Sequence, residues 1–315
     1  MASFSGIVGI VFSCIFGVAV AQLSSDFYAT SCPKALSIIN DTVVKAVQKE
    51  LRMGASLLRL QFHDCFVNGC DGSVLLDQTS NITGEKDALQ NQNSLRGFEV
   101  VDDIKAELEH ACPGVVSCAD ILTVAARDSV VALGGPSWAV ELGRRDSLNA
   151  SKEAAEKDLP VFSHDLETLT ALFARKGFNA SELVILSGGH TIGSAACVTY
   201  RVHIYNDTYI DPVFRQSLQS ICKFRGPIDP LAALDNTADV FDNEFFKDLL
   251  HLKGVLRTDQ VLYHNATTDE LVKTYSNNSA LFFSDFGAAM VKLGKLDVLL
   301  GSQGQIRTNC RKVNE

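Results

Sequence analysis

The sequence predicts an all-α protein, and three observations lead to this prediction. Apolar residues recur along most of the chain at the three- and four-residue spacing of a helix face. Runs that alternate apolar and polar residues, as half-buried strands do, are scarce. Ser, Pro and Gly residues stand where the helical runs would begin and end. The 315 residues, of which 46% are hydrophobic, are enough for one large domain or two smaller lobes.

The first expected helices lie near the N-terminus. Ser31-Cys32-Pro33 opens an amphipathic run to about Leu51, with a proline in the first turn. Arg59 and His63 are four residues apart, so they would share one face of the next helix. Another periodic segment spans 94–110.

Start and stop signals mark the later helices. Ser117-Cys118-Ala119-Asp120 has the pattern of a capping box, and the run behind it would end at Gly134-Gly135-Pro136. Ser163 would cap a helix through Phe173. Further periodic segments lie at 180–187, 191–204, 213–221, 242–252, 267–276 and 279–294. Long loops are expected between the helices, at 65–93, 136–162 and 223–241. Loops of this length are usually functional or held by disulfide bonds.

The first 21 residues have the features of a secretory signal peptide. They carry no charge, and Ile7 to Ala21 is an apolar run that ends in Ala19-Val20-Ala21. A basic n-region is missing, and a membrane anchor is the alternative, but a span needs about 20 apolar residues and this run is shorter. We therefore expect a signal peptide at 1–21, a mature domain at 22–315 and a secreted protein.

The cysteines are consistent with an oxidising compartment. Cys14 would leave with the signal peptide, and an even number remains, as a disulfide framework requires. These eight cysteines are Cys32, Cys65, Cys70, Cys112, Cys118, Cys197, Cys222 and Cys310. A zinc site is disfavoured because no C-x-x-C occurs. The sequence alone leaves the pairing open.

The expected surface is acidic and glycosylated. The net charge is −9 and no basic stripe is present, which makes nucleic acid and anionic membranes poor partners. Seven N-x-S/T sequons begin at Asn40, Asn81, Asn149, Asn179, Asn206, Asn265 and Asn277.

Arg59 and His63 are the first candidates for chemistry. A neutral imidazole beside a fixed guanidinium suits a reaction in which a base takes a proton while a cation stabilises developing negative charge. The alternative is a buried structural pair, which is the commoner meaning of such a spacing.

Other candidates are weaker when taken alone. His190 follows a Gly-Gly pair, and by itself it would be a packed histidine beside a turn. Asp259 could orient a ligand imidazole by accepting its Nδ1 hydrogen. Asp64, Asp71 and Ser73 could bind a hard cation together with nearby carbonyls, although the EF-hand spacing is absent.

Two long motifs give these candidates a context. The stretch from Arg59 to Ser73 (RLQFHDCFVNGCDGS) resembles the distal-haem signature of the secreted plant haem peroxidases of class III. The stretch from Leu186 to Gly193 (LSGGHTIG) resembles the proximal-haem signature of the same family. The resemblance runs from Gln22 to the C-terminus and includes Gly84–Ala88, Asn93–Phe98, Val116–Asp120, Gly134–Trp138, Gly143–Asp146, Phe241–Asn243 and Gly304–Cys310.

The resemblance implies a haem peroxidase fold with haem b between two mainly helical lobes, a distal lobe at about 22–162 and a proximal lobe at about 163–315. His190 would be the axial ligand, and Asp259 would accept its ring hydrogen. His63 would take a proton from hydrogen peroxide and return it to the leaving oxygen. Arg59 would stabilise the charge, and phenolic donors would return the electrons one at a time.

The resemblance also assigns supporting residues. Asn91 would hydrogen-bond the distal histidine and fix its tautomer. Phe62 would pack over the porphyrin, Ser94 would help to bind the cofactor, and Pro160 would contact the substrate. Leu89 stands where an aromatic residue often lines the access channel, and the usual second proline after Pro160 is absent. These departures affect donor preference rather than the reaction with peroxide.

Two calcium ions and four disulfides are implied as well. The distal calcium ligands would be Asp64, Val67, Gly69, Asp71 and Ser73, with Glu85 nearby through water. The proximal ligands would be Thr191, Asp235, Thr237 and Asp242, although Ala238 replaces the usual proline there. The implied pairs are Cys32–Cys112, Cys65–Cys70, Cys118–Cys310 and Cys197–Cys222.

Some alternatives stay open. A catalytically inactive secreted glycoprotein of the same fold, acting as a binding or structural module, is the competing hypothesis. It is disfavoured because Arg59, His63, Asn91, His190 and Asp259 are all present. Asp120 and Arg144 would form either a buried pair or a solvated one. We expect a monomer. Because the chain ends five residues after Cys310, we expect it at the cell exterior or wall rather than in the vacuole.

Overall fold

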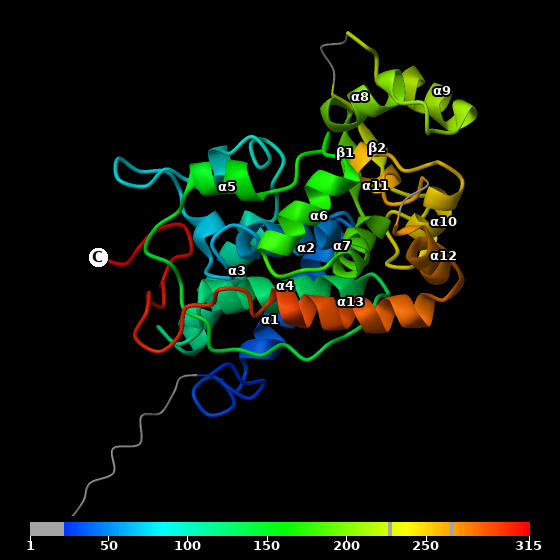
Figure 1. Cartoon of the computed structure of the whole chain (residues 1–315). Helices are drawn as coiled ribbons and strands as arrows, with labels where there is room; N and C mark the ends of the chain where they lie inside the picture. Colours follow the sequence, from blue (N-terminus) through cyan, green and yellow to red (C-terminus); the bar gives the residue numbers. More distant parts are fainter. Residues whose placement is uncertain (1–21, 226–228, 265–266) are drawn as a thin grey trace, which may run out of the picture.

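The computed structural model describes residues 22–225, 229–264 and 267–315. This part of the chain is predominantly helical, as predicted (Figure 1). The expected signal peptide, with Cys14, and the sequon at Asn265 lie outside the described residues. Over the described ranges, no helix combines the length and apolar character that a membrane span requires.

The N-terminal half is built around a buried helix, α4 (Cys118–Ala132). Small and apolar residues cover nearly all of its faces, so it packs against α1, α2 and α3 at once. The elements of this half are α1 (Ala35–Lys49), α2 (Met53–Cys65), η1 (Ser73–Leu75), η2 (Glu85–Asp87), α3 (Phe98–Ala111), α4 and α5 (Lys152–Asp158).

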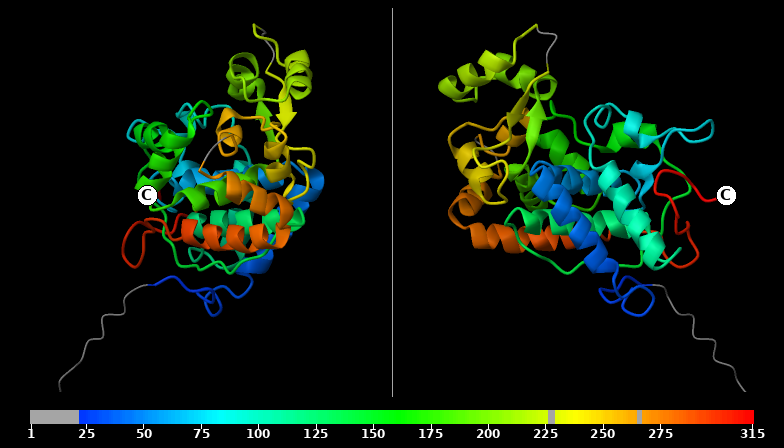
Figure 2. Two further views of the ribbon diagram at one scale, coloured as in Figure 1. Left: turned by 45° about the vertical axis from the view of Figure 1, so that its right-hand side comes forward. Right: turned by 180° about the vertical axis from the view of Figure 1, so that it is seen from behind.

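The C-terminal half continues with short helices and ends in a long one, α13 (Ser279–Leu293), which packs against α7 (Ala180–Ser187). The other elements are α6 (Leu166–Arg175), η3 (Gly188–Thr191), β1 (Ser194–Ala196), α8 (Cys197–Asn206), α9 (Pro212–Ile221), β2 (Leu231–Ala233), α10 (Glu244–Leu250), α11 (Arg257–Gln260) and α12 (Asp269–Asn277). Helices α8 and α9 project from the body beyond the small β1–β2 sheet (Figures 1 and 2).

Four segments differ from the expected elements. The predicted helix at 191–204 begins only at Cys197, because Gly193 adopts a φ of 99° and the next residues form β1, antiparallel to β2. The expected loop at 223–241 therefore contains a strand, and the loop at 136–162 contains α5. Asp165 rather than Ser163 caps α6, since its side chain accepts the Thr168 N–H.

The contacts of Asp120 bear on two predictions, the capping box at Ser117–Asp120 and the pair with Arg144. Ser117 caps α4 by accepting the Asp120 N–H at 3.1 Å, but the reciprocal half of a capping box is missing. The Asp120 carboxylate instead binds Arg144 at 2.7 Å and accepts the Tyr28 hydroxyl at 2.7 Å. Both members of the Asp120–Arg144 pair are fully buried, so the buried alternative is correct. Arg144 also donates to the carbonyl of Gly294, which ties α4 to the end of α13.

The eight cysteines pair as the resemblance implied. Cys118 at the start of α4 joins Cys310 near the C-terminus, so the last residues are held against the buried helix. The other bonds are Cys32–Cys112, Cys65–Cys70 and Cys197–Cys222.

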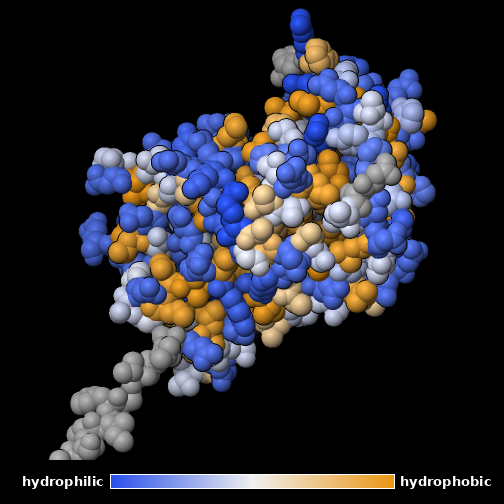
Figure 3. Space-filling view, viewed as in Figure 1, coloured by the Kyte–Doolittle hydropathy of each residue, from blue (hydrophilic) through white to orange (hydrophobic). Residues whose placement is uncertain are grey.

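The surface mixes hydrophilic and hydrophobic residues, as one face in Figure 3 shows. Most of the described sequon asparagines are exposed, namely Asn81, Asn149, Asn179, Asn206 and Asn277. Asn40 is the half-buried exception, because it lies within α1.

Candidate active site

The predicted distal pair lies on one face of α2. His63 is buried, and its Nδ1 is 2.5 Å from Asn91 Oδ1. The Asn91 amide donates to the Glu85 carbonyl at 2.9 Å, which turns Oδ1 towards the imidazole, so Nδ1 carries the proton. Nε2 is then a lone-pair acceptor, and Arg59 Nε donates to it at 3.1 Å. The structure thus defines one tautomer of His63.

Arg59 is held from several sides. Its Nη1 donates to the carbonyl of Ser94 at 3.0 Å. Its Nη2 donates to the carbonyl of Gln90 at 2.9 Å and to the Ser94 hydroxyl at 3.1 Å. Burial, with a smaller effect of the Arg52 charge, lowers the pKa of Arg59 to about 10, so the guanidinium remains charged at neutral pH. The planar cation is therefore fixed beside the imidazole.

His63 is kept neutral. Burial and the adjacent charge of Arg59 hold its pKa well below the usual value, against a smaller opposing effect of the Asn91 hydrogen bond. A neutral imidazole, whose Nε2 lone pair is shared here with the Arg59 Nε–H, is the form that can accept a proton.

His190 lies at the end of α7, in the turn η3. Gly188 allows this turn to approach the core, because a Cβ there would be 2.5 Å from the Phe282 ring. Nδ1 of His190 is 2.8 Å from Asp259 Oδ1, as predicted, and Asp259 is buried. Burial lowers the pKa of His190, but the charge and hydrogen bond of Asp259 outweigh it and raise the pKa above its usual value.

The two histidines belong to neighbouring elements, since η3 contacts α2. The His190 side chain is 42% exposed, yet burial has the largest single effect on its pKa. The ring is thus surrounded by protein without being fully covered by it. The charge of His190 also contributes to the pKa of His63, so the two rings share this region.

The remaining predicted residues of the distal side also lie near α2. Phe62 is half-buried and stacks on Phe66 with ring centroids 4.6 Å apart. Pro160 is half-buried in the loop after α5, and the Gln90 side chain donates to the carbonyl of the preceding Leu159 at 3.4 Å. The segment that holds Arg59 is therefore joined to the predicted substrate loop.

A group of buried carboxyls lies behind His63. Asp64 accepts the backbone N–H of Gly72 at 2.9 Å, and Asp71 accepts that of Ser73 at 2.9 Å. Burial raises the pKa of Asp64, Asp71 and Glu85, in the last case to about 8. Ser73 Oγ and Glu85 Oε2 are buried without a hydrogen-bond partner. The charge of Arg307 lowers the pKa of Asp71 but does not outweigh burial, so these buried acidic groups are incompletely neutralised.

The predicted proximal residues also converge. The Thr191 hydroxyl lies 2.8 Å from Asp235 Oδ2 and 3.1 Å from Asp242 Oδ1. The Thr237 N–H donates to Asp235 Oδ1 at 2.8 Å, and burial raises the pKa of Asp235 to about 7. In the described ranges, no three His, Cys, Asp or Glu side chains form a metal-binding group by themselves. Metal binding at either place would also need hydroxyl and carbonyl oxygens.

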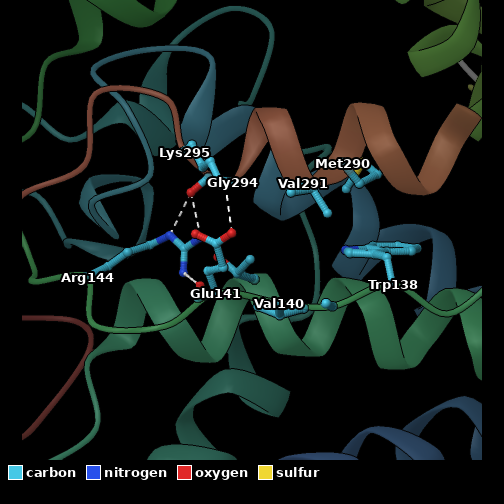
Figure 4. Close-up of a pocket in the computed structure, with 10 residues that line it drawn as sticks. Trp138, Val140, Glu141, Arg144, Met290, Val291, Gly294 and Lys295 are labelled. Atoms are coloured by element: carbon cyan, nitrogen blue, oxygen red, sulfur yellow. Dashed lines mark hydrogen bonds and ion pairs between the residues drawn. The ribbon is translucent and has the colours of Figure 1, made fainter. Parts of the chain in front are cut away.

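A small pocket elsewhere is unrelated to the histidines. It has about 200 Å³ of empty space, some of it open to solvent, beside the Arg144–Gly294 contact (Figure 4). Trp138 lines it and packs edge-on against Phe286 with centroids 5.9 Å apart, which fits a packing role for this tryptophan.

Two contacts at the site were not predicted from the sequence. The Gln90 carbonyl binds Arg59, and Lys176 Nζ donates to the carbonyl of Val67 and contacts Asp158 at 2.7 Å. No local pattern marks either residue, because a backbone carbonyl carries no sequence signal and a lysine in α6 resembles any surface lysine.

Comparison with known proteins identifies the class to which this fold and site belong. The sequence model of the family described as Peroxidase matches residues 39–278. The chain belongs to the peroxidase family and is a peroxidase enzyme.

Its relatives place it more narrowly among the plant class III peroxidases, which confirms the resemblance. It is 52% identical to Peroxidase 4 of Vitis vinifera over 95% of this chain and 94% of that protein. It is 53% identical to Peroxidase 70 of Zea mays over 99% of both chains. The lignin-forming anionic peroxidase of Nicotiana sylvestris is 52% identical over 93% of this chain and 92% of that one.

Proposed function

We propose that this peroxidase is a secreted haem enzyme that uses hydrogen peroxide to oxidise small phenolic donors in one-electron steps. One observation carries the proposal: His63 and His190 lie on contacting elements, and each has its Nδ1 committed to a fixed partner. Haem b would lie between them, with the distal lobe at about 22–162 and the proximal lobe at about 163–315.

The residues fit such a group. His190 Nε2 would be available as an iron ligand, because Nδ1 is bound to Asp259 and the side chain is 42% exposed. Arg59 and Phe62 on α2 are only partly buried and would contact the same bound group from α2, with Ser94 holding Arg59. Bound haem would supply the iron that takes oxidising equivalents from peroxide and passes them on one electron at a time.

His63 is the proposed general acid and base. Its neutral Nε2 accepts a proton from hydrogen peroxide and then returns it to the leaving oxygen, while Asn91 keeps Nδ1 protonated. Arg59 stabilises the negative charge that develops as the O–O bond breaks, and its four contacts hold it in place before the reaction.

Asp259 is the proposed electronic partner of His190. By accepting the Nδ1 hydrogen at 2.8 Å, it gives the imidazole more anionic character and makes Nε2 a stronger electron donor.

Calcium is the proposed partner of the two oxygen clusters. The distal ion would balance the buried carboxyls and satisfy Ser73 Oγ, using Asp64, Val67, Gly69, Asp71 and Ser73, with Glu85 through water. The proximal ion would use Thr191, Asp235, Thr237 and Asp242. Asn91 links the distal cluster to His63 through the Glu85 carbonyl.

The donor would reach the haem edge between Leu89 and Pro160. Leu89 is 71% exposed and adjoins Gln90, whose side chain reaches the Pro160 loop, so a flat apolar ring would have a contact surface there. Secretion is supported by the uncharged segment 1–21 and by the four disulfides, which persist in oxidising compartments. We propose a monomer at the cell exterior or wall.

Absorbance of the purified protein tests the proposal. A Soret band that shifts on adding peroxide is expected, and His190→Ala should lose most of the haem absorbance on gel filtration. A panel of phenolic and non-phenolic donors at steady state then tests substrate class. Protein made with ample haem that shows no Soret band would refute the proposal.

A further inference from the structure

The second oxygen of Asp259 depends on the start of α11. Its Oδ1 is bound to His190 Nδ1, and its Oδ2 accepts the backbone N–H of Leu256 at 3.4 Å. The orientation of the carboxylate therefore depends on where Leu256 and Arg257 lie. Helix α11 has only four residues, so its position depends on side-chain anchors. Gln260, its last residue, binds Gly254 and Leu249, and Arg257 is its first residue.

Arg257 is anchored from outside α11. Its Nη1 contacts Asp207 Oδ1 at 2.9 Å, just beyond the end of α8. Asp207 is only 8% exposed, and its other oxygen is 2.7 Å from Nδ1 of His203, which is fully buried. The Arg215 guanidinium donates to the Asp207 carbonyl. Asp207 is thus a fixed point for Arg257.

The Asp259–His190 hydrogen bond and the Asp207–Arg257 ion pair connect the same two segments of the chain. From His190 the chain runs through β1 and α8 to Asp207, and the ion pair then returns it to Arg257, two residues before Asp259. In Figure 1, α11 lies beside the β1–β2 sheet from which α8 projects. A displacement of α11 relative to α8 would change the Asp259–His190 hydrogen bond.

We propose that Asp207 and Arg257 are positioning residues for the Asp259–His190 pair. They act through Leu256 and the Asp259 carboxylate and do not touch the reacting atoms. The inference rests on the proposed function, because its consequence is read on a haem bound by His190. Loosening the Asp207–Arg257 pair weakens the hydrogen bond to His190 Nδ1 and makes Nε2 a poorer electron donor.

The hydrogen bond is weakened rather than lost, so the contribution of one whole hydrogen bond, about tenfold in an equilibrium constant, is the upper limit of the effect. We therefore expect the equilibrium constant for one-electron reduction of the bound haem to rise by up to about tenfold, which is about 59 mV.

The test compares Arg257→Gln and Asp207→Asn holoenzymes by redox titration and by the iron–histidine vibration. Positioning predicts that both variants raise the reduction potential and lower the vibrational frequency. A purely electrostatic role predicts opposite shifts, because one variant removes a positive charge and the other a negative charge. Opposite shifts, or no shift in either variant, would overturn the inference.

Three controls complete the test. Arg257→Lys keeps the ion pair and should keep a potential near that of the wild type. If Asp207→Asn does not fold, the comparison of Arg257→Gln with Arg257→Lys still tests the inference. Arg311→Gln removes an arginine of similar exposure, which pairs with the more exposed Asp102 at 2.7 Å, away from α11, and should leave the potential unchanged. Asp259→Asn should shift the potential most. If it shifts nothing, the proposed function fails, whereas a shift there without one at Arg257 refutes only the positioning role.

Discussion

On the proposed calcium assignment, the metal-free form of this peroxidase should lose stability as the pH rises. In the structure, burial and then the charge of Asp71 raise the pKa of Glu85 from 4.5 to about 8. The unfolded chain releases this proton near pH 4.5, whereas the folded, metal-free protein holds it until about pH 8. The stabilisation is therefore fully present below pH 4.5, falls progressively as the pH rises, and is lost by the time the pH passes about 8.

The magnitude follows from the pKa difference. At about 1.4 kcal/mol per pH unit, Glu85 alone lowers the free energy of unfolding by up to roughly 5 kcal/mol at pH 8. Asp64 and Asp71 act in the same direction, because burial raises the pKa of both. For a domain of this size the change corresponds to a fall in Tm on the order of 10 °C.

Thermal unfolding followed by circular dichroism at pH 5 and pH 8 measures this change. With chelator, Tm should be lower at pH 8, and excess calcium should remove the difference because the ion binds the ionised carboxylates. Glu85→Gln should flatten much of the metal-free slope, whereas Glu153→Gln, at an exposed position on α5, should not. A metal-free Tm that is the same at both pH values would refute the reasoning.

The other predictions concern the distal pair and the core. His63→Ala should slow the reaction with peroxide by about 10²–10⁴-fold in stopped-flow measurements, and a near-normal rate would exclude a base at this position. Arg59→Leu removes a charge that lowers the pKa of His63, so the acid limb of the pH–rate profile should move to higher pH; an unmoved limb would assign it to another group. Gly188→Ala places a Cβ 2.5 Å from the Phe282 ring and should lower the free energy of unfolding by about 1–3 kcal/mol, measured by denaturant titration; an unchanged midpoint would show that the ring can move aside.

The positions of most helices follow from local sequence. The segment predicted at 180–187 is α7 with the same bounds, and the segment predicted at 279–294 is α13 to within one residue. A helix face is built from residues three and four apart, so its pattern is visible in a short window. The same reasoning fails at 191–204, because a strand of three residues forms only when a distant partner pairs with it.

The side chains proposed for catalysis on the distal side could also be predicted from a short stretch of sequence. Arg59, His63 and Asp64 lie within six consecutive residues, so their common helix was predictable before any contact was known. The peroxidase family is evident in the same short motifs, and the comparisons confirm it.

The sequence by itself thus determined the helices, the family and the types of side chain that carry the chemistry. The family resemblance already implied that Asp259 meets His190. Only the tertiary structure decided that Asp207 meets Arg257 and that the Asp120–Arg144 pair is buried rather than solvated. The physical reason is burial. A charged group removed from water must take whichever opposite charge or hydrogen-bond partner the packed chain brings within about 3 Å, and local sequence patterns do not specify that partner.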